Sequence, residues 1–83
     1  MNAIAQIPAR LLVIEDDSVL SGHLHDYFSE RHYLVSQCSD GPAGLEAAAS
    51  GDYDLVLLDI LLPGLNGLEL LNALRQQSPV PVI

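Results

Sequence analysis

The sequence is poor in positive charge and in cysteine. It holds three arginines and no lysine against eleven acidic residues, which gives a formal net charge of −8. Nucleic acids are bound chiefly through lysine and arginine contacts to phosphate, so this segment should repel DNA and RNA and attract cations. With Cys38 as its single cysteine, the chain can form no internal disulfide.

Long apolar runs are absent as well. No run approaches the ~20 residues that a helix needs to cross a bilayer, so no membrane partner is expected. Residues Met1 to Pro8 carry neither a basic start nor a long apolar core, which argues against a signal peptide. We therefore expect a cytoplasmic protein. Hydrophobic residues make up 49 % of the 83 positions, which favours one small packed domain over a disordered chain.

Two short apolar runs each end in acid. Leu11–Ile14 is followed by Glu15–Asp17, and Leu55–Leu58 is followed by Asp59. Continuous apolar runs of this length are typical of strands that helices cover on both faces. A carboxylate at the end of such a strand is costly unless something binds it. The two acidic ends therefore predict one shared site.

Strand-like and helix-like patterns alternate along the chain. The expected elements are a strand at 11–14, a helix at 18–30, a strand at 33–38, a helix that starts at 41 and is ended by Gly51, a strand at 54–59, a helix at 67–77 and the start of a strand at 80–83. This alternation predicts right-handed crossovers and a doubly wound, parallel α/β sheet. Residues 1–9 are interpreted as a flexible leader. Residues 10–83 are interpreted as an incomplete domain, because doubly wound domains usually have about five strands or more.

Helix starts and helix faces give further expectations. Acidic residues are favoured at the start of a helix, so Asp17 is interpreted as an N-cap rather than as a ligand. Asn66 is expected to cap the last helix. Along that helix, Leu68, Leu71 and Leu74 are expected to point inward.

Ligands of open parallel sheets bind beyond the carboxyl ends of the strands, at a switch point in strand order. If the first and third strands are neighbours, Glu15, Asp16 and Asp59 lie close together and repel one another unless a cation is present. Mg²⁺ suits this arrangement, because it takes one or two carboxylates and often completes its shell with a phosphate. A carboxylate in such a site can also act as a nucleophile, and Asp59 is the better candidate. By spacing alone, Asp59 is equally well explained as an ordinary turn acid.

Three segments in this order, Leu11–Asp17, Asp54–Gly67 and Pro79–Ile83, resemble the receiver domain of two-component response regulators. The resemblance implies a flavodoxin-like fold with strand order 2-1-3-4 and the fifth strand missing, because receivers have the strand order 2-1-3-4-5. It also implies a phosphorelay signalling switch rather than an enzyme, with a sensor histidine kinase as partner.

The resemblance assigns roles to individual residues. Asp59 would accept a phosphoryl group from the phosphohistidine of the kinase. Asp16 and Asp59 would bind Mg²⁺ directly, together with the backbone carbonyl of Leu61. Glu15 would act on the metal through a bound water. The family's Ser or Thr at the end of the fourth strand, and its Lys at the end of the fifth, both fall after Ile83, so the segment is expected to hold the acceptor but lack the readout.

The output is implied by a weaker similarity. Leu62–Gly64 resembles the same loop in receivers that are joined to a winged-helix DNA-binding domain. This similarity implies regulation of transcription through a DNA-binding domain outside this chain, and a homodimer controlled by phosphorylation.

Two other functions stay open at this point. A Mg²⁺-dependent phosphohydrolase on a similar sheet would need an acid two residues after its nucleophile, and that position here is Leu61. A pseudo-receiver that binds partners without phosphorylation is the other alternative, although the acids at 15, 16 and 59 argue against it.

Overall fold

The computed structural model describes residues 7–59 and 66–83. Its elements are, in order, β1 (Arg10–Ile14), α1 (Ser18–Glu30), β2 (Leu34–Cys38), α2 (Gly41–Ala49), β3 (Leu55–Leu58) and α3 (Gly67–Arg75). The expected alternation of strands and helices is confirmed, and the bounds differ from the expected ones by only a residue or two. Gly51 takes a left-handed backbone conformation (φ 87°) just after α2, as expected of a helix-ending glycine.

The strands form a parallel sheet in the order β2-β1-β3. Leu11 of the central strand lies opposite Val35 on one side and Leu55 on the other. Beyond β3, the expected start of a fourth strand forms one parallel bridge, between Val56 and Val82. The Ile83 N–H donates to the carbonyl of Val56 at 2.9 Å, so this segment lies in the place of a fourth strand. The predicted order 2-1-3-4 is confirmed to this extent.

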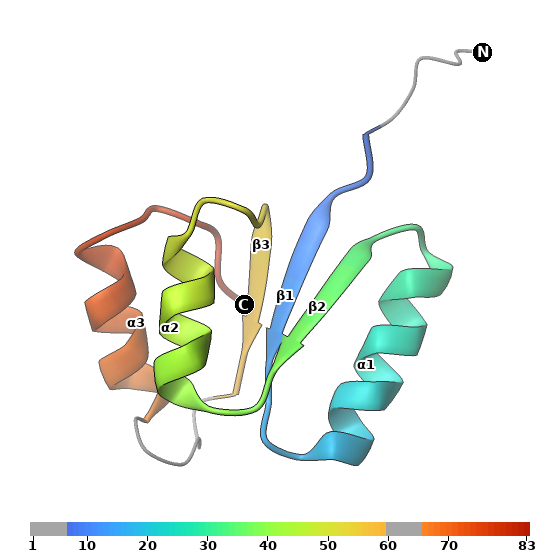
Figure 1. The fold of residues 1–83 in the computed structure, drawn as a ribbon, viewed down its shortest axis with the longest axis horizontal. Helices are drawn as coiled ribbons and strands as arrows, with labels where there is room; N and C mark the ends of the chain where they lie inside the picture. The colour runs from blue at the N-terminus through green and yellow to red at the C-terminus, as the bar shows by residue number, and fades with distance from the viewer. Residues whose placement is uncertain (1–6, 60–65) are drawn as a thin grey trace.

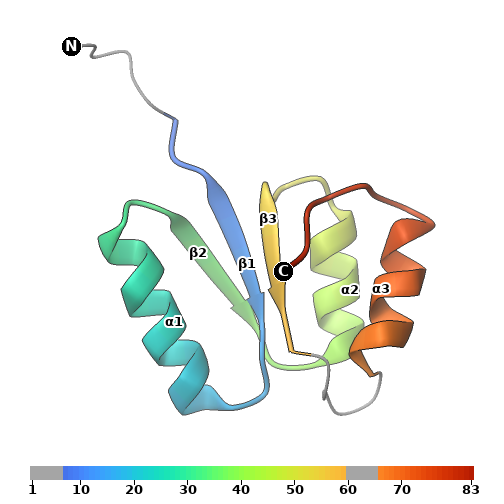
Figure 2. The ribbon, with the colours of Figure 1, turned by 180° about the vertical axis from the view of Figure 1, so that it is seen from behind.

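Helices cover both faces of the sheet. Helix α1 lies on one face, and α2 and α3 lie side by side on the other (Figures 1 and 2). The main core forms between the sheet and the α2–α3 layer, and its most deeply buried side chains are Leu12, Ile14, Val56, Leu70 and Leu74. Leu11 and Val13, which point to the other face, are buried as well. Both faces of β1 are therefore covered, which explains why its sequence is a continuous apolar run.

The caps of the three helices are polar side chains that accept backbone hydrogen bonds. Asp17 caps α1, Asp40 caps α2 and Asn66 caps α3, so the expected roles of Asp17 and Asn66 are confirmed. No helix in the described ranges is long and apolar enough to span a membrane.

The inward face of α3 differs from the expected one. Leu68 is 65 % exposed, whereas Leu70 and Leu74 are fully buried and Leu71 is half-buried. Positions three apart drift by about 60° per step around an α-helix, so a pattern of strict threes leaves the buried face. The prediction for Leu68 was wrong for this reason.

Candidate functional site

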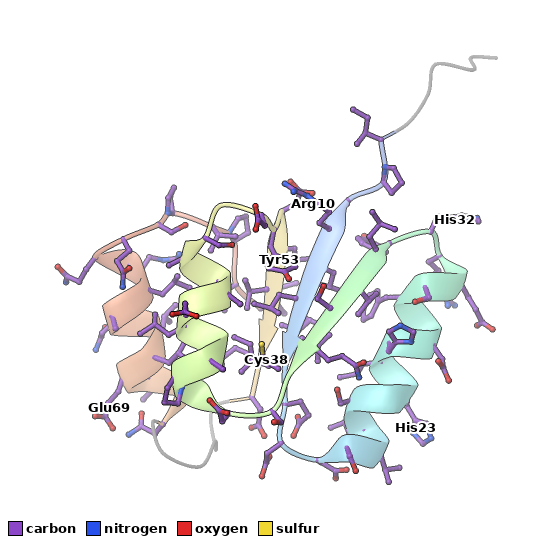
Figure 3. All side chains as sticks on the ribbon, in the orientation of Figure 1. Arg10, His23, His32, Cys38, Tyr53 and Glu69 are labelled. Atoms are coloured by element: carbon purple, nitrogen blue, oxygen red, sulfur yellow. The ribbon has the colours of Figure 1, made fainter. Side chains whose placement is uncertain are left out.

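Three acids meet at the carboxyl edge of the sheet. The loops after β1 and β2 leave the sheet at one end, the lower end in Figure 1. Figure 3 shows Arg10, the first residue of β1, at the opposite end. Glu15 and Asp16 follow β1, and Asp59 follows β3. One carboxylate oxygen from each of these three residues lies within 4.8 Å of the others. We call these three residues the acidic cluster.

Pairing of the strands explains why the acidic cluster forms. Ile14 lies opposite Leu58 in the register of β1 and β3, so the residues that follow them begin at the same height. The Asp59 N–H donates to the Ile14 carbonyl at 3.0 Å, and the Glu15 N–H donates to the Cys38 carbonyl at 3.0 Å. The ladder therefore continues for one residue past the strands and holds the backbone of both acidic ends.

Burial and like charge make the acidic cluster unfavourable when all three groups are ionised. Glu15 is only 8 % exposed, Asp59 is half-buried and Asp16 is exposed. Burial raises the pKa of Glu15, and hydrogen bonding and charge from Asp59, together with hydrogen bonding to Asp16, raise it further. One backbone hydrogen bond opposes this rise in pKa: the Asp17 N–H donates to Glu15 Oε2 at 3.1 Å. A cation among these oxygens would relieve the repulsion.

The donor set fits Mg²⁺. All three ligand atoms are carboxylate oxygens, which suit a hard cation that keeps part of its water shell. The neighbouring Asp17 caps α1 instead of joining this donor set, because its Oδ1 accepts hydrogen bonds from the N–H groups of Val19 and Leu20. The residues present are therefore sufficient for a site with one or two direct carboxylate ligands and room for water.

A cavity of about 630 Å³ opens beside the acidic cluster. The cluster acids form part of its wall, and apolar side chains from the sheet and α1 form much of the rest, among them Val13, Leu20, Leu24 and Leu57. A ligand in this cavity can therefore reach the exposed Asp16 and the half-buried Asp59.

Two features expected from the sequence lie outside the described residues. They are the backbone carbonyl of Leu61, expected as a metal ligand, and the loop Leu62–Gly64.

Two further observations concern residues next to the acidic cluster. Cys38 is half-buried. Burial raises the pKa of its thiol, and the charge of Asp40 raises it further, so the thiol stays protonated near neutral pH. The hydrogen bond from the Asp17 backbone to Glu15 was not predicted, because a backbone amide leaves no signal in the sequence.

Parallel strands in this order, helices on both faces and acids at the carboxyl edge define a flavodoxin-like α/β protein of the receiver type. The family model described as "Response regulator receiver domain" matches residues 11–83. The chain therefore belongs to the receiver domains of two-component response regulators.

Curated relatives include transcriptional regulators. The chain is 51 % identical over 74 residues to the transcriptional activator protein PfeR of Pseudomonas aeruginosa, covering 89 % of this chain and 24 % of the relative. It is 38 % identical over 73 residues to the response regulator ArlR of Staphylococcus epidermidis, covering 88 % of this chain and 33 % of the relative. The chain thus spans about a quarter to a third of the length of these relatives.

Solved structures of receivers share the fold. The receiver domain of the sensor histidine kinase PA1611 of Pseudomonas aeruginosa, solved with a magnesium ion coordinated in its active-site cleft, matches with a TM-score of 0.86 at 26 % identity. That match covers 92 % of this chain and 65 % of the other. The response regulator TrrA of Thermotoga maritima, in complex with Mg²⁺ and BeF, matches with a TM-score of 0.79 at 34 % identity, covering 84 % of this chain and 61 % of the other.

Proposed function

We propose that this receiver is the phosphoacceptor of a two-component phosphorelay and that Asp59 takes the phosphoryl group from a sensor histidine kinase. The observation that carries the proposal is the acidic cluster, with oxygens of Glu15, Asp16 and Asp59 within 4.8 Å of one another at the edge where open parallel sheets bind ligands. The open cavity beside the cluster supports access by a donor group.

Mg²⁺ is the proposed cofactor of this site. Asp16 and Asp59 would bind it directly, Glu15 would act through a bound water, and the backbone carbonyl of Leu61 would complete the protein ligands. When bound, Mg²⁺ supplies positive charge that offsets the charge of the phosphoryl oxygens in a loose transition state. The PA1611 receiver was solved with magnesium and TrrA in complex with Mg²⁺, which supports the same choice here.

The acceptor step asks little of the protein beyond positioning. A new bond forms between a carboxylate oxygen of Asp59 and phosphorus, while the bond between phosphorus and the imidazole nitrogen of the donor histidine breaks. The electron pair of that bond stays with the imidazole, and a carboxylate nucleophile has no proton to lose, so no general base is required. The hydrogen bond from the Asp59 N–H to Ile14 fixes the backbone from which the nucleophile projects.

The output proposed for the whole protein is control of transcription. PfeR is a transcriptional activator by name, and the matched segment is 24 % of its length, which supports a DNA-binding domain outside this chain. Under this proposal residues 1–9 are a leader and residues 10–83 are the N-terminal part of the receiver. The protein would work in the cytoplasm, and phosphorylation would control a homodimer.

The test is transfer of labelled phosphoryl groups to the full-length protein from acetyl phosphate or from a histidine kinase. Label should appear with Mg²⁺ and be lost with EDTA. Asp59→Asn should abolish labelling, because an amide is a poor nucleophile. The matched control is Asp54→Asn, which alters an acid at the other end of β3 and should leave labelling intact.

Undiminished label in Asp59→Asn would overturn the assignment of the acceptor. Sustained release of phosphate from a small phosphomonoester would instead favour the phosphohydrolase alternative.

A further inference from the structure

Asp17 occupies the junction between the acidic cluster and α1. Its Oδ1 accepts hydrogen bonds from Val19 N–H at 3.0 Å and from Leu20 N–H at 3.1 Å. Its carbonyl accepts the first hydrogen bond of the helix, from Ser21 N–H at 2.9 Å. The side chain and the carbonyl of Asp17 are therefore both committed to the helix start, and its backbone is held in one extended conformation (φ −77°, ψ 108°).

The backbone N–H of Asp17 forms a hydrogen bond with the acidic cluster. Its N–H donates to Glu15 Oε2 at 3.1 Å, so the direction of this N–H sets the direction of the Glu15 carboxylate. Asp16 lies between the two and shares the same short loop. On the other side, the Glu15 N–H is tied to the Cys38 carbonyl of β2 at 3.0 Å. The loop is thus fixed at β2 and at α1, and Asp17 provides the second attachment.

We infer that Asp17 is a positioning residue for the metal site: its cap on α1 aims its own N–H at Glu15 and holds Glu15 and Asp16 in the geometry that binds Mg²⁺. This inference rests on the proposed function of the cluster. Groups that orient the ligands of a metal, without touching it, typically change metal affinity by about 10–100-fold when removed.

A set of substitutions separates the cap from the charge. Asp17→Asn and Asp17→Ser keep a side-chain oxygen that can cap the helix but remove the charge. Asp17→Ala removes both. Asp17→Gly also offers no side-chain acceptor, yet it disturbs a helix start less than alanine does, so it serves where Asp17→Ala folds poorly. Asp40→Ala is the matched control, because Asp40 caps α2 in the same way, accepting from Ala43 N–H at 2.8 Å, outside the acidic cluster.

The measurements are Mg²⁺ affinity by calorimetry and the Mg²⁺ dependence of labelling by acetyl phosphate, both on the full-length protein at fixed ionic strength. Asp17→Ala and Asp17→Gly should weaken Mg²⁺ binding by about tenfold or more and raise the Mg²⁺ concentration for half-maximal labelling. The rate at saturating Mg²⁺ should be retained. Asp17→Asn and Asp17→Ser should stay within about threefold of wild type. Asp40→Ala should lose stability without a change in Mg²⁺ affinity.

If Asp17→Gly or Asp17→Ala binds Mg²⁺ with wild-type affinity, this inference is overturned and the proposed function of the cluster still stands. Equal weakening in Asp17→Asn would also overturn it, since charge would then be the cause. A wild-type protein that binds no Mg²⁺ would overturn the proposed function of the cluster and this inference with it.

Discussion

Glu15 is a buried carboxylate beside two other acids, and its proton equilibrium should be visible in folding stability. Burial and its acidic neighbours raise the pKa of Glu15 above the ordinary value of 4.5. The unfolded chain keeps the ordinary pKa and the folded protein has the raised one. At a pH between the two, the folded protein therefore binds more protons than the unfolded one. Stability conferred by the protonated group is therefore lost as the pH rises above 4.5 through the raised pKa, and the loss is complete above it.

Substitution of Glu15 by Gln should remove this pH dependence. In metal-free buffer, the free energy of unfolding of Glu15→Gln should exceed that of wild type by an amount that grows from pH 4.5 upward and then levels off. Urea denaturation across that range, with EDTA present, measures the difference. If the free energies of unfolding of the two proteins change with pH in parallel, the Glu15 carboxylate is not the source of this pH dependence.

The convergence of Glu15, Asp16 and Asp59 could be predicted from the sequence, because the carboxyl ends of neighbouring parallel strands meet at one edge. The capping role of Asp17 followed from the preferences of a helix start. The burial of Glu15 could not be predicted in the same way. It depends on tertiary packing around the loop after β1, and the Asp17 N–H that donates to Glu15 is a group that every residue but proline possesses.

At the scale of elements, the approach of α2 to β1 depends on a missing side chain. A Cβ added at Gly44 would lie 2.7 Å from Ile14 Cγ2 and 2.9 Å from Ile14 Cδ1. Ile14 is fully buried and branched at Cβ, so its side chain has little freedom to move. Ile14 is also the last residue of β1, directly before Glu15 and Asp16 of the acidic cluster.

Gly44→Ala should therefore destabilise the protein although alanine is the better helix former. Overpacking of a core costs typically ~1–3 kcal/mol, against a gain in helix propensity of ~1 kcal/mol, so a net loss of up to about 2 kcal/mol is expected from these two effects. Gly22→Ala in α1 is the control, because nothing lies within 4 Å of its added Cβ. It should stabilise the protein by ~0.5–1 kcal/mol. Equal shifts in urea midpoint for the two variants would show that contact with Ile14 is unimportant.

The elements themselves were predictable to different degrees. Periodicity located α1 to the residue, because its cap and its length are both local features. The end of α3 was set too late, at 77 instead of Arg75. The N–H groups of Gln77 and Ser78 both donate to the carbonyl of Leu74, which tightens the last turn in a way that side-chain patterns do not reveal. The start of a strand expected at 80–83 pairs in parallel with β3 at Val82, and the N–H groups of Val56 and Leu58 donate to the carbonyls of Pro81 and Ile83.

At the scale of the whole molecule, the net charge of −8 makes stability respond to salt in two ways. Any salt screens the general self-repulsion of an acidic chain. A cation that binds the folded site but not the unfolded chain adds a second, saturable effect. The two are separable, because the first depends only on ionic strength and the second on the ligand.

Mg²⁺ should therefore stabilise the protein more than NaCl does at equal ionic strength. The excess should reach ~2.7 kcal/mol at a free concentration of 100 times the dissociation constant. Asp16→Ala, which removes one carboxylate of the acidic cluster, should lose most of this excess and keep the response common to both salts. Asp52→Ala removes the same charge from the exposed segment after α2 and should retain the excess. Thermal or urea unfolding in matched salts measures it. If Asp16→Ala keeps the full excess, Asp16 is not a ligand; if wild type shows none, the acidic cluster binds no metal and the high charge acts only through screening.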